Sequence, residues 1–455
     1  MPTLSGQQTI RITTNWLKVM NIKKVAFIGA NSAMGAKTAA IIAAFGDLPV
    51  FMIARDIKKA KDGIEIAVRS VRSNSIRSNL IPSTYSDLPR ILKQCDWIVE
   101  AVAENYEIKT SVNLLIKKTK KKGRIISSLT SGLSIAKLSG VLDDDDRKNY
   151  MGVHFFNPPY KMLLCEVIPS KYTDLTKTKE LETFLEKVLL RKVIQAKDSP
   201  AFVANRIGFQ LINEAAIYAY KYRDRGGVSY IDSLLGRHTG RALAPLETLD
   251  FVGLDVHKAI IDNLKNNLSN TDSAIATFSM PSFLQTLIRK GKFGNKSGDG
   301  LYTKKEIEGH KKRFTFDIKT NKYLPHQKYY SPVVEAMREY IHKGEYKRAF
   351  HILKESSHAD ADIIKYFIAR YISYSFSLVG DVVDNKEIID RAMGFGFSWV
   401  PPSAMVDLLG GVDETSTMIK KYKLQVPTLL ALHKKSSNNF YKLQAELDYR
   451  SLIKV

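Results

Sequence analysis

Short apolar runs alternate with longer helical patterns over the first part of this chain, between Lys23 and Asp198. In order, the runs are KKVAFIG, PVFMIA, DWIVEAV, GRIISSL, YMGVHFF, LLCEVI and KVIQA. This alternation predicts βαβ units, which build a largely parallel sheet with helices on both of its faces. The runs are almost continuously apolar, as expected for strands that helices cover on both sides. The chain is therefore expected to begin with an α/β domain.

Beyond Pro200 the pattern changes to long amphipathic helices. This helical part contains two similar segments, APLETLDFVG from Ala244 and PPSAMVDLLG from Pro401, at a constant offset of 157 residues. We interpret them as two copies of one helical unit. A charged stretch that Gly309 and Pro325 interrupt would connect the copies.

The net charge bounds the partners of the chain. With 69 Lys and Arg against 46 Asp and Glu, the formal charge is +23, which attracts anions such as phosphorylated cofactors. The basic residues are scattered and do not form the aromatic and basic platform of a nucleic-acid module. We therefore expect no nucleic-acid partner.

The cysteines and the absence of long apolar runs indicate the compartment. The two cysteines, Cys95 and Cys165, exclude a disulfide framework and agree with a reducing environment; both lie in apolar runs and are interpreted as packing residues. No run approaches the ~20 apolar residues of a membrane span, and residues 1–20 lack the apolar core of a signal peptide. We expect a cytoplasmic protein without a membrane span.

The segment VAFIGANSAMGAKTAA joins the first apolar run to a helix of small residues through a glycine-containing turn. In a βαβ unit, a dinucleotide pyrophosphate binds at this place, on the N-terminus of the helix. The turn departs from G-x-G-x-x-G because Gly29 to Gly35 spans one residue more, with Asn31 in place of the middle glycine. Asparagine tolerates a positive φ angle, so the turn can still form. The alternative is a glycine-rich turn that binds no ligand. The predicted phosphate-binding residues are Gly29, Ala30, Asn31, Ser32, Ala33, Met34 and Gly35.

The end of the second apolar run bears on the choice of nucleotide. An acidic residue is expected there to bind the ribose 2′-hydroxyl, but the run ends at Ala54, followed by Arg55 and Asp56. A small residue followed by arginine is typical of a site for a 2′-phosphate, so NADP is one possibility. Asp56 could instead bend back to the ribose. We expect NAD, with NADP as the alternative.

The expected fold class is an α/β Rossmann-type dinucleotide-binding domain followed by two all-α domains. The predicted organisation is an N-terminal extension (1–22), the dinucleotide-binding domain (23–198), a first helical domain (199–303), a linker (304–327) and a second, degenerate helical domain (328–455).

Four polar residues lie in apolar strand and turn contexts: Ser131 in SSLTSGLSI, His154 in GVHFFNPP, Glu166 in LLCEVIPS and Asn205 in DSPAFVANRI. Burying each alone would be costly, so we interpret them as one site. His154 and Glu166 lie on β-rich runs separated by a turn at 157–160, and a hairpin-like return would place the carboxylate against the imidazole. Such a carboxylate keeps the ring basic, which suits abstraction of a hydroxyl proton. The alternative is a core histidine bonded to the backbone.

Together these motifs resemble the 3-hydroxyacyl-CoA dehydrogenase family. The resemblance runs from about Lys23 to Tyr302 and continues more weakly into the second helical copy. Its most specific pieces are DWIVEAVAENYEIK, SSLTSGLSI, GVHFFNPP, DSPAFVANRI, TLDFVGLD and GNKSGDGLY. The chain is similar in particular to the bacterial long forms, which carry two helical copies and often an enoyl-CoA hydratase domain. No hydratase domain follows here, so we expect no hydration activity.

The resemblance implies a role for each matched residue. His154 would be the catalytic base and Glu166 its orienting partner, while Ser131 and Asn205 would hydrogen-bond the substrate oxygen. Contacts with the nicotinamide nucleotide would come from Glu104, Lys109, Asn157 and Lys296, beside the glycine turn; no metal is implied. Ala54 and Arg55, at the end of the second apolar run, complete the predicted cofactor-binding residues. The alternative for Lys109 and Lys296 is that they are solvated surface lysines without a nucleotide contact. The alternative for Asn157 is that it only caps its turn. Leu129 departs from the asparagine that is common in the serine loop.

The expected activity is NAD-dependent oxidation of a 3-hydroxyacyl-CoA to a 3-oxoacyl-CoA, a step of fatty-acid β-oxidation. One alternative is an NADPH-linked 3-oxoacyl-CoA reductase. Another is a nucleotide-binding homologue that has lost catalysis and has a structural or regulatory role. The second helical copy is expected to cover a surface that single-copy relatives bury by dimerisation, so we expect a monomer, with a homodimer as the alternative.

Overall fold

The computed structural model describes residues 22–433 and 439–455, and the chain divides between Asp198 and Ser199 into two compact units. The predicted N-terminal extension, residues 1–22, lies outside the described residues except for Ile22. None of the helices in the two described ranges combines the length and the apolar character that crossing a membrane requires.

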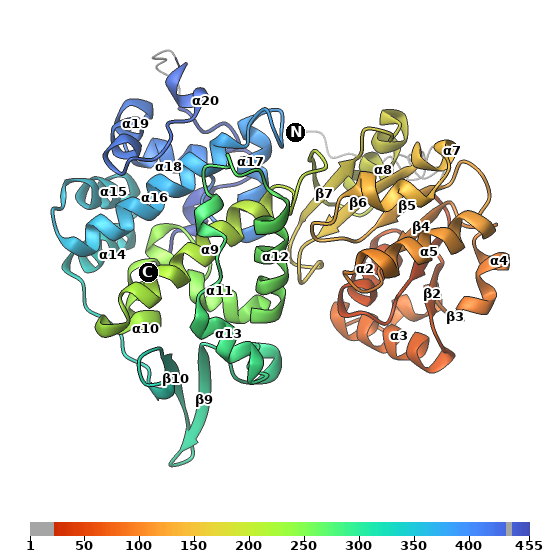
Figure 1. Cartoon of the computed structure of the whole chain (residues 1–455), viewed down its shortest axis with the longest axis horizontal. Helices are drawn as coiled ribbons and strands as arrows, with labels where there is room; N and C mark the ends of the chain where they lie inside the picture. The colour runs from red at the N-terminus through yellow and green to blue at the C-terminus, as the bar shows by residue number, and fades with distance from the viewer. Residues whose placement is uncertain (1–21, 434–438) are drawn as a thin grey trace, which may run out of the picture. The chain divides into compact units, whose positions relative to one another are not determined.

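The first unit is built on an eight-stranded sheet with the strand order β3-β2-β1-β4-β5-β6-β7-β8 (Figure 1). Neighbouring strands are parallel except β6 and β7, which are antiparallel. The strands are β1 (Val25–Ile28), β2 (Val50–Ala54), β3 (Leu80–Thr84), β4 (Trp97–Glu100), β5 (Ile125–Ser128), β6 (Tyr150–Phe155), β7 (Leu164–Pro169) and β8 (Lys192–Gln195). The prediction of an α/β Rossmann-type domain followed by a helical region is confirmed.

The edge strand β3 was not among the predicted runs. Its sequence is LIPST, and three of its five residues are only partly buried. Pro82 has no N–H to donate to a neighbouring strand, so it is tolerated at the edge of a sheet but not at its centre. A continuous apolar run indicates a strand that is covered on both faces. This strand is only partly covered and contains polar residues, so its sequence does not show such a run.

Helices pack on both faces of this sheet. They are α2 (Ala33–Phe45), α3 (Ile57–Val71), α4 (Leu88–Ile91), α5 (Tyr106–Thr119), α6 (Ile135–Leu138), α7 (Asp144–Arg147) and α8 (Leu175–Lys187). The main core joins apolar side chains of α2, α3 and α8 with strand residues that include Val153, Cys165 and Val167. Because side chains alternate along a strand, His154 and Glu166 point to the opposite face. On that face Gly152 lies against Ile135 of α6.

The second unit is largely helical. Its helices are α9 (Ala204–Lys221), α10 (Gly227–Leu234), α11 (Pro245–Val252), α12 (Leu254–Asn267), α13 (Ser282–Arg289), α14 (Pro332–His342), α15 (Tyr346–Glu355), α16 (Ala359–Ser377), α17 (Lys386–Ala392), α18 (Pro402–Leu408), α19 (Val412–Lys421) and α20 (Thr428–Ala431). Helix α9 is buried continuously from Ala204 to Ala216, and α10, α11, α12 and α16 pack against it.

The two similar segments make the same hydrogen bonds. Asp250, on α11, accepts hydrogen bonds from the backbone amides of residues 301 and 302, at 2.7 Å each. Asp407, on α18, accepts them from the amides of residues 440 and 441, at 2.9 and 3.0 Å. Both helices begin with a proline in their first turn. These correspondences support the predicted duplication, which remains a prediction.

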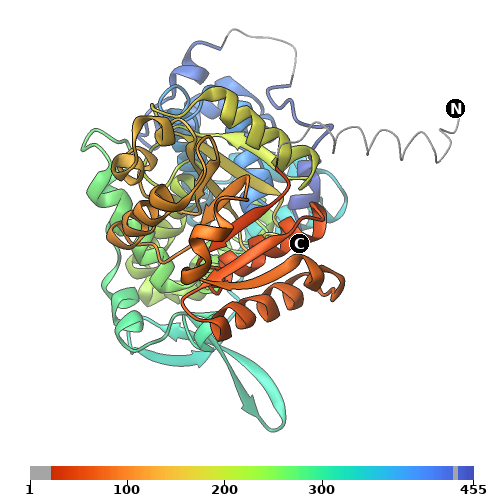
Figure 2. The same cartoon turned by 90° about the vertical axis from the view of Figure 1, so that its right-hand side faces the viewer.

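The stretch predicted as a linker, residues 304–327, is folded. With its flanks it forms an antiparallel sheet of β9 (Tyr302–Ile307), β10 (His310–Asp317) and β11 (Lys322–Pro325), in the order β11-β10-β9. The β9–β10 hairpin extends away from the helices of its unit (Figure 1, Figure 2). Phe314 and Phe316 are buried and alternate with polar residues, as side chains do along a strand with one covered face. The many charged residues of this stretch make the alternation difficult to recognise in the sequence. The role of this sheet as the connector between the two helical copies remains a prediction.

Candidate active site

The turn between β1 and α2 leads into the N-terminus of a helix of 13 residues. Ser32 caps this helix: its Oγ accepts a hydrogen bond from the Gly35 amide (3.0 Å) and donates one to the Ala101 carbonyl oxygen (3.1 Å). Gly29 has a φ angle of +86°, and a Cβ there would lie 2.8 Å from the Ala101 carbonyl carbon. A Cβ at Gly35 would lie 2.6 Å from Ser32 Oγ. The backbone thus forms a cradle at a helix N-terminus, which fits a dinucleotide pyrophosphate.

The expectation that Asn31 lets this turn form by taking a positive φ angle is wrong. Asn31 is exposed and does not have a positive φ angle. Between residues 29 and 35, only Gly29 has a positive φ angle. Ala30 is buried, and Gly63 of α3 leaves room for it, since a Cβ at Gly63 would lie 2.7 Å from the Ala30 carbonyl oxygen. Ala33 is exposed and Met34 packs against the main core.

Replacing Gly29 with alanine is expected to weaken nucleotide binding. The new Cβ would collide with backbone atoms that have little freedom to move, so the turn must shift. We expect the Kd for NADH, measured by fluorescence titration, to rise at least about tenfold, which is ~1.4 kcal/mol. Gly123→Ala is the matched control, because Gly123 also has a positive φ angle (+73°) but no atom within 4 Å of its Cβ position. An unchanged Kd for Gly29→Ala would contradict a role of this turn in binding.

The end of β2 has no acidic residue that is free to bind the ribose 2′-hydroxyl. Ala54 is buried and Arg55 is exposed. Asp56 caps α3, and its Oδ1 accepts a hydrogen bond from the Lys59 amide at 2.8 Å. This backbone hydrogen bond holds the pKa of the exposed Asp56 carboxyl below its usual value. Asp56 is therefore engaged by its own helix, and binding of a ribose would have to share its carboxylate.

His154 and Glu166 are direct neighbours across the antiparallel pair of β6 and β7. His154 Nδ1 lies 2.6 Å from Glu166 Oε2, and both residues are buried, with Glu166 completely so. The edge of Phe156 packs against the imidazole, with ring centroids 4.5 Å apart. An ionised carboxylate can only accept a hydrogen bond, so beside such a carboxylate Nδ1 would carry the proton and Nε2 the lone pair. The hairpin-like contact that the sequence predicts between His154 and Glu166 is present in the structure.

The neighbouring Cys165 has another environment. It pairs with Phe155 on the core face of the same two strands. Burial raises the pKa of the Cys165 thiol well above its usual value, and burial raises that of Cys95 to about 12. Both thiols therefore stay protonated at neutral pH and act as packing groups.

Ser131 lies on the loop after β5, which is held at both ends. Glu104 Oε1 accepts hydrogen bonds from the Ser131 amide (2.8 Å) and from Thr130 Oγ1 (2.6 Å). Further along, the Asp198 carboxylate accepts hydrogen bonds from the amides of residues 135 and 136, at 2.8 Å each. The position of Ser131 is thus set by two carboxylates that are distant from it in sequence.

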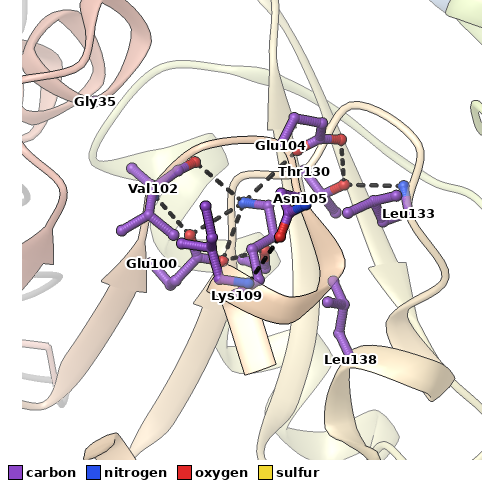
Figure 3. A network of polar contacts seen from close by, with 12 residues as sticks. Gly35, Glu100, Val102, Glu104, Asn105, Lys109, Thr130, Leu133 and Leu138 are labelled. Atoms are coloured by element: carbon purple, nitrogen blue, oxygen red, sulfur yellow. Dashed lines mark hydrogen bonds and ion pairs between the residues drawn. The ribbon is translucent and has the colours of Figure 1, made fainter. Parts of the chain in front are cut away.

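Lys109 is enclosed in a polar network (Figure 3). Its side chain and that of Glu100 are both 0% exposed, and its Nζ donates to the two carboxylate oxygens of Glu100 at 3.0 and 3.1 Å. The same Nζ lies 3.6 Å from Glu104 Oε2. The alternative that Lys109 is a solvated surface lysine is therefore wrong. A contact between Lys109 and the nucleotide remains a prediction.

The other predicted site residues belong to different units. Asn157 is exposed, and its Oδ1 accepts a hydrogen bond from Lys37 Nζ of α2 at 3.1 Å. In the second unit, Asn205 is the second residue of α9 and is 6% exposed. Lys296, also in the second unit, is exposed and pairs with Asp255 at 2.5 Å. The structure brings His154 to Glu166 and Ser131 to Glu104.

The sequence interpretation missed Glu100, Thr130 and Asp198. A signal for Glu100 was present, because a carboxylate at the end of an apolar strand is costly unless a cation or several donors satisfy it. Thr130 and Asp198 belong to quoted motifs, but their partners are set by the fold and not by a local pattern.

Comparisons with known proteins identify the family to which both parts of the chain are similar. Residues 24–199 match the model of the NAD binding domain of 3-hydroxyacyl-CoA dehydrogenase, and residues 202–304 match the model of its C-terminal domain. A probable 3-hydroxyacyl-CoA dehydrogenase of Deinococcus radiodurans is 33% identical over 314 residues, which cover 66% of this chain and 88% of the relative.

Two further matches extend into residues 328–455, the predicted second helical domain. A probable 3-hydroxyacyl-CoA dehydrogenase of Bacillus subtilis is 32% identical over 419 residues, which are 86% of this chain. The match spans about half of that relative's length (51%). The crystal structure of 3-hydroxybutyryl-CoA dehydrogenase from Escherichia coli superposes with a TM-score of 0.67 over 90% of this chain and 98% of that one; at 19% identity it shows a common fold.

Proposed function

Because this chain belongs to the 3-hydroxyacyl-CoA dehydrogenase family of oxidoreductases, we propose that it oxidises a 3-hydroxyacyl-CoA to the corresponding 3-oxoacyl-CoA. The observation that carries the proposal is the buried hydrogen bond between His154 and Glu166. The cofactor is NAD, in agreement with the matched NAD binding domain and the cradle at Gly29 and Gly35. In a cell the reaction would be a step of fatty-acid β-oxidation.

The His154–Glu166 pair would move the proton. Glu166 holds the proton on Nδ1, so the lone pair of Nε2 takes the proton of the C3 hydroxyl group. The imidazole becomes an imidazolium ion, and the buried carboxylate stabilises that charge. When bound, NAD supplies the acceptor for the hydride that leaves C3. The pair is suited to this task because it needs no rearrangement before the proton moves.

The remaining residues would bind and orient. We propose that Ser131 and Asn205 donate hydrogen bonds to the substrate oxygen, and that the turn from Gly29 to Gly35 holds the pyrophosphate. Glu104, Lys109, Asn157 and Lys296 are proposed to support the nucleotide, directly or through neighbours. The positive charge of the chain would attract the phosphates of CoA. A monomer in the cytoplasm remains our expectation.

One observation favours a second candidate, an NADPH-linked 3-oxoacyl-CoA reductase. Arg55 is exposed directly after the buried Ala54, while Asp56 is engaged as a helix cap. An arginine in this place can bind a 2′-phosphate. Measuring kcat/KM for NADH and for NADPH with the same substrate decides between the two nucleotides.

The proposed function is tested by following NADH oxidation at 340 nm with acetoacetyl-CoA and with longer 3-oxoacyl-CoA esters. We expect saturable turnover with at least one chain length. Binding of NADH without turnover, for any chain length and with either nucleotide, would instead support a homologue that has lost catalysis.

A further inference from the structure

Glu100 joins three elements of the first unit from a fully buried position at the end of β4. Its Oε1 accepts hydrogen bonds from the Val102 amide (2.6 Å) and Lys109 Nζ (3.0 Å). Its Oε2 accepts from Lys109 Nζ (3.1 Å) and from Ser128 Oγ on β5 (2.6 Å). Figure 3 shows the contacts of Glu100 with Val102 and Lys109. These four hydrogen bonds satisfy the Glu100 carboxylate with groups of the first unit alone.

On one side, Glu100 fixes the surface beneath the phosphate-binding turn. Its hydrogen bond to the Val102 amide holds the backbone of Ala101 and Val102. Ser32, the cap of α2, donates its hydroxyl proton to the Ala101 carbonyl oxygen. A Cβ at Gly29 would lie only 2.9 Å from the Val102 nitrogen, so the turn rests directly on this backbone.

On the other side, Glu100 is connected to the loop of Ser131. Asn105 caps α5, which places Glu104 just before the helix and Lys109 about one turn inside it. Lys109 Nζ is held by Glu100 and lies 3.6 Å from Glu104 Oε2. The other oxygen of Glu104 accepts the hydrogen bond from the Ser131 amide. The positive charge of Lys109 thus lies between the two carboxylates and ties them together.

From these contacts we propose that Glu100 is a positioning residue, which acts through Lys109 and Glu104 on Ser131. A buried ion pair contributes little net stability compared with well-packed apolar residues, because both charges lose their hydration. It does, however, fix geometry, since each donor must point to its acceptor. The pair of Glu100 and Lys109 therefore serves the orientation of the serine loop and the nucleotide turn.

This inference rests on the proposed function, and Glu100→Gln tests it. The substitution keeps the size of the side chain but removes the charge that holds Lys109. We expect kcat for NADH oxidation with acetoacetyl-CoA to fall on the order of 10²-fold, as for other small displacements of a reacting geometry. Asp146→Asn is the matched control: the ion pair of Lys120 and Asp146 is also buried, with side chains 4% and 6% exposed, and lies in the same unit. Its loss should lower the melting temperature and leave kcat unchanged.

A double-mutant cycle with Ser131→Ala shows whether Glu100 acts through this serine. If it does, Glu100→Gln lowers kcat much less in the Ser131→Ala background than in the wild type. Independent, additive losses in kcat would overturn the proposal. Ser128→Ala provides a second route if Glu100→Gln fails to fold, because it removes the hydroxyl that donates a hydrogen bond to Glu100 Oε2. It should show the same coupling to Ser131.

Turnover by the wild type distinguishes a failure of the proposed function from a failure of the positioning role of Glu100. No turnover by the wild type would refute the proposed function. Wild-type turnover together with equal kcat values for Glu100→Gln and Asp146→Asn would refute only the positioning role.

Discussion

Replacing His154 with alanine is expected to lower kcat for NADH-linked reduction of acetoacetyl-CoA by about 10²–10⁴-fold, the usual contribution of a general acid or base. In this direction the imidazolium would donate the proton that the base accepts during oxidation. The substitution leaves the backbone of the turn from Gly29 to Gly35 unchanged, so the Kd for NADH should stay at the wild-type value. Steady-state kinetics and fluorescence titration measure the two quantities.

Two further variants show whether the loss belongs to the pair. Glu166→Gln keeps a polar partner for Nδ1 but removes the carboxylate that stabilises the imidazolium, so kcat should also fall while NADH still binds. His257→Ala is the control, because His257 is a buried histidine in the second unit that is hydrogen-bonded to Asn213 at 2.9 Å. It should lose stability and retain kcat. Wild-type kcat in His154→Ala would contradict the assigned base.

Replacing Lys109 with methionine is expected to destabilise the first unit by about 3–5 kcal/mol, because Glu100 would be left as an unpaired buried charge. Methionine fills much of the same volume, so the loss measures the charge and not a cavity. Urea unfolding of the full chain, followed by circular dichroism, should show an earlier transition. Lys117→Met on the exposed side of the same helix is the control and should change the free energy of unfolding by less than about 0.5 kcal/mol. Equal midpoints for the two variants would contradict the assigned ion pair.

The sequence predicted the parts of the fold that depend on continuous apolar runs. Strands buried on both faces are legible because nearly every residue in them is apolar. The strand with Pro82 and the sheet around Phe314 and Phe316 were not predicted, because polar residues and turn formers dominate their composition. Their pairing partners come from the tertiary structure, which a local pattern does not contain.

The site was predictable where it is local. His154 and Glu166 flank a short turn, so an antiparallel return aligns them with few alternatives. The contact between Glu100 and Ser128 was not predictable in the same way, because it depends on the parallel register of β4 and β5, which pairs these two residues. Likewise, the enclosure of Lys109 follows from the packing of α5 against the sheet and not from its spacing in AENYEIK.

Transfer of deuterium from NADH to the substrate tests the proposed reaction most directly. Acetoacetyl-CoA is incubated with NADH that is deuterated at C4, using each of the two C4 epimers in turn, and the product is examined by mass spectrometry and NMR. With one epimer, we expect 3-hydroxybutyryl-CoA that carries deuterium at C3, and the His154→Ala variant should form it far more slowly. Product without deuterium from either epimer, or no product from the wild-type chain with any 3-oxoacyl-CoA, would contradict hydride transfer at this site.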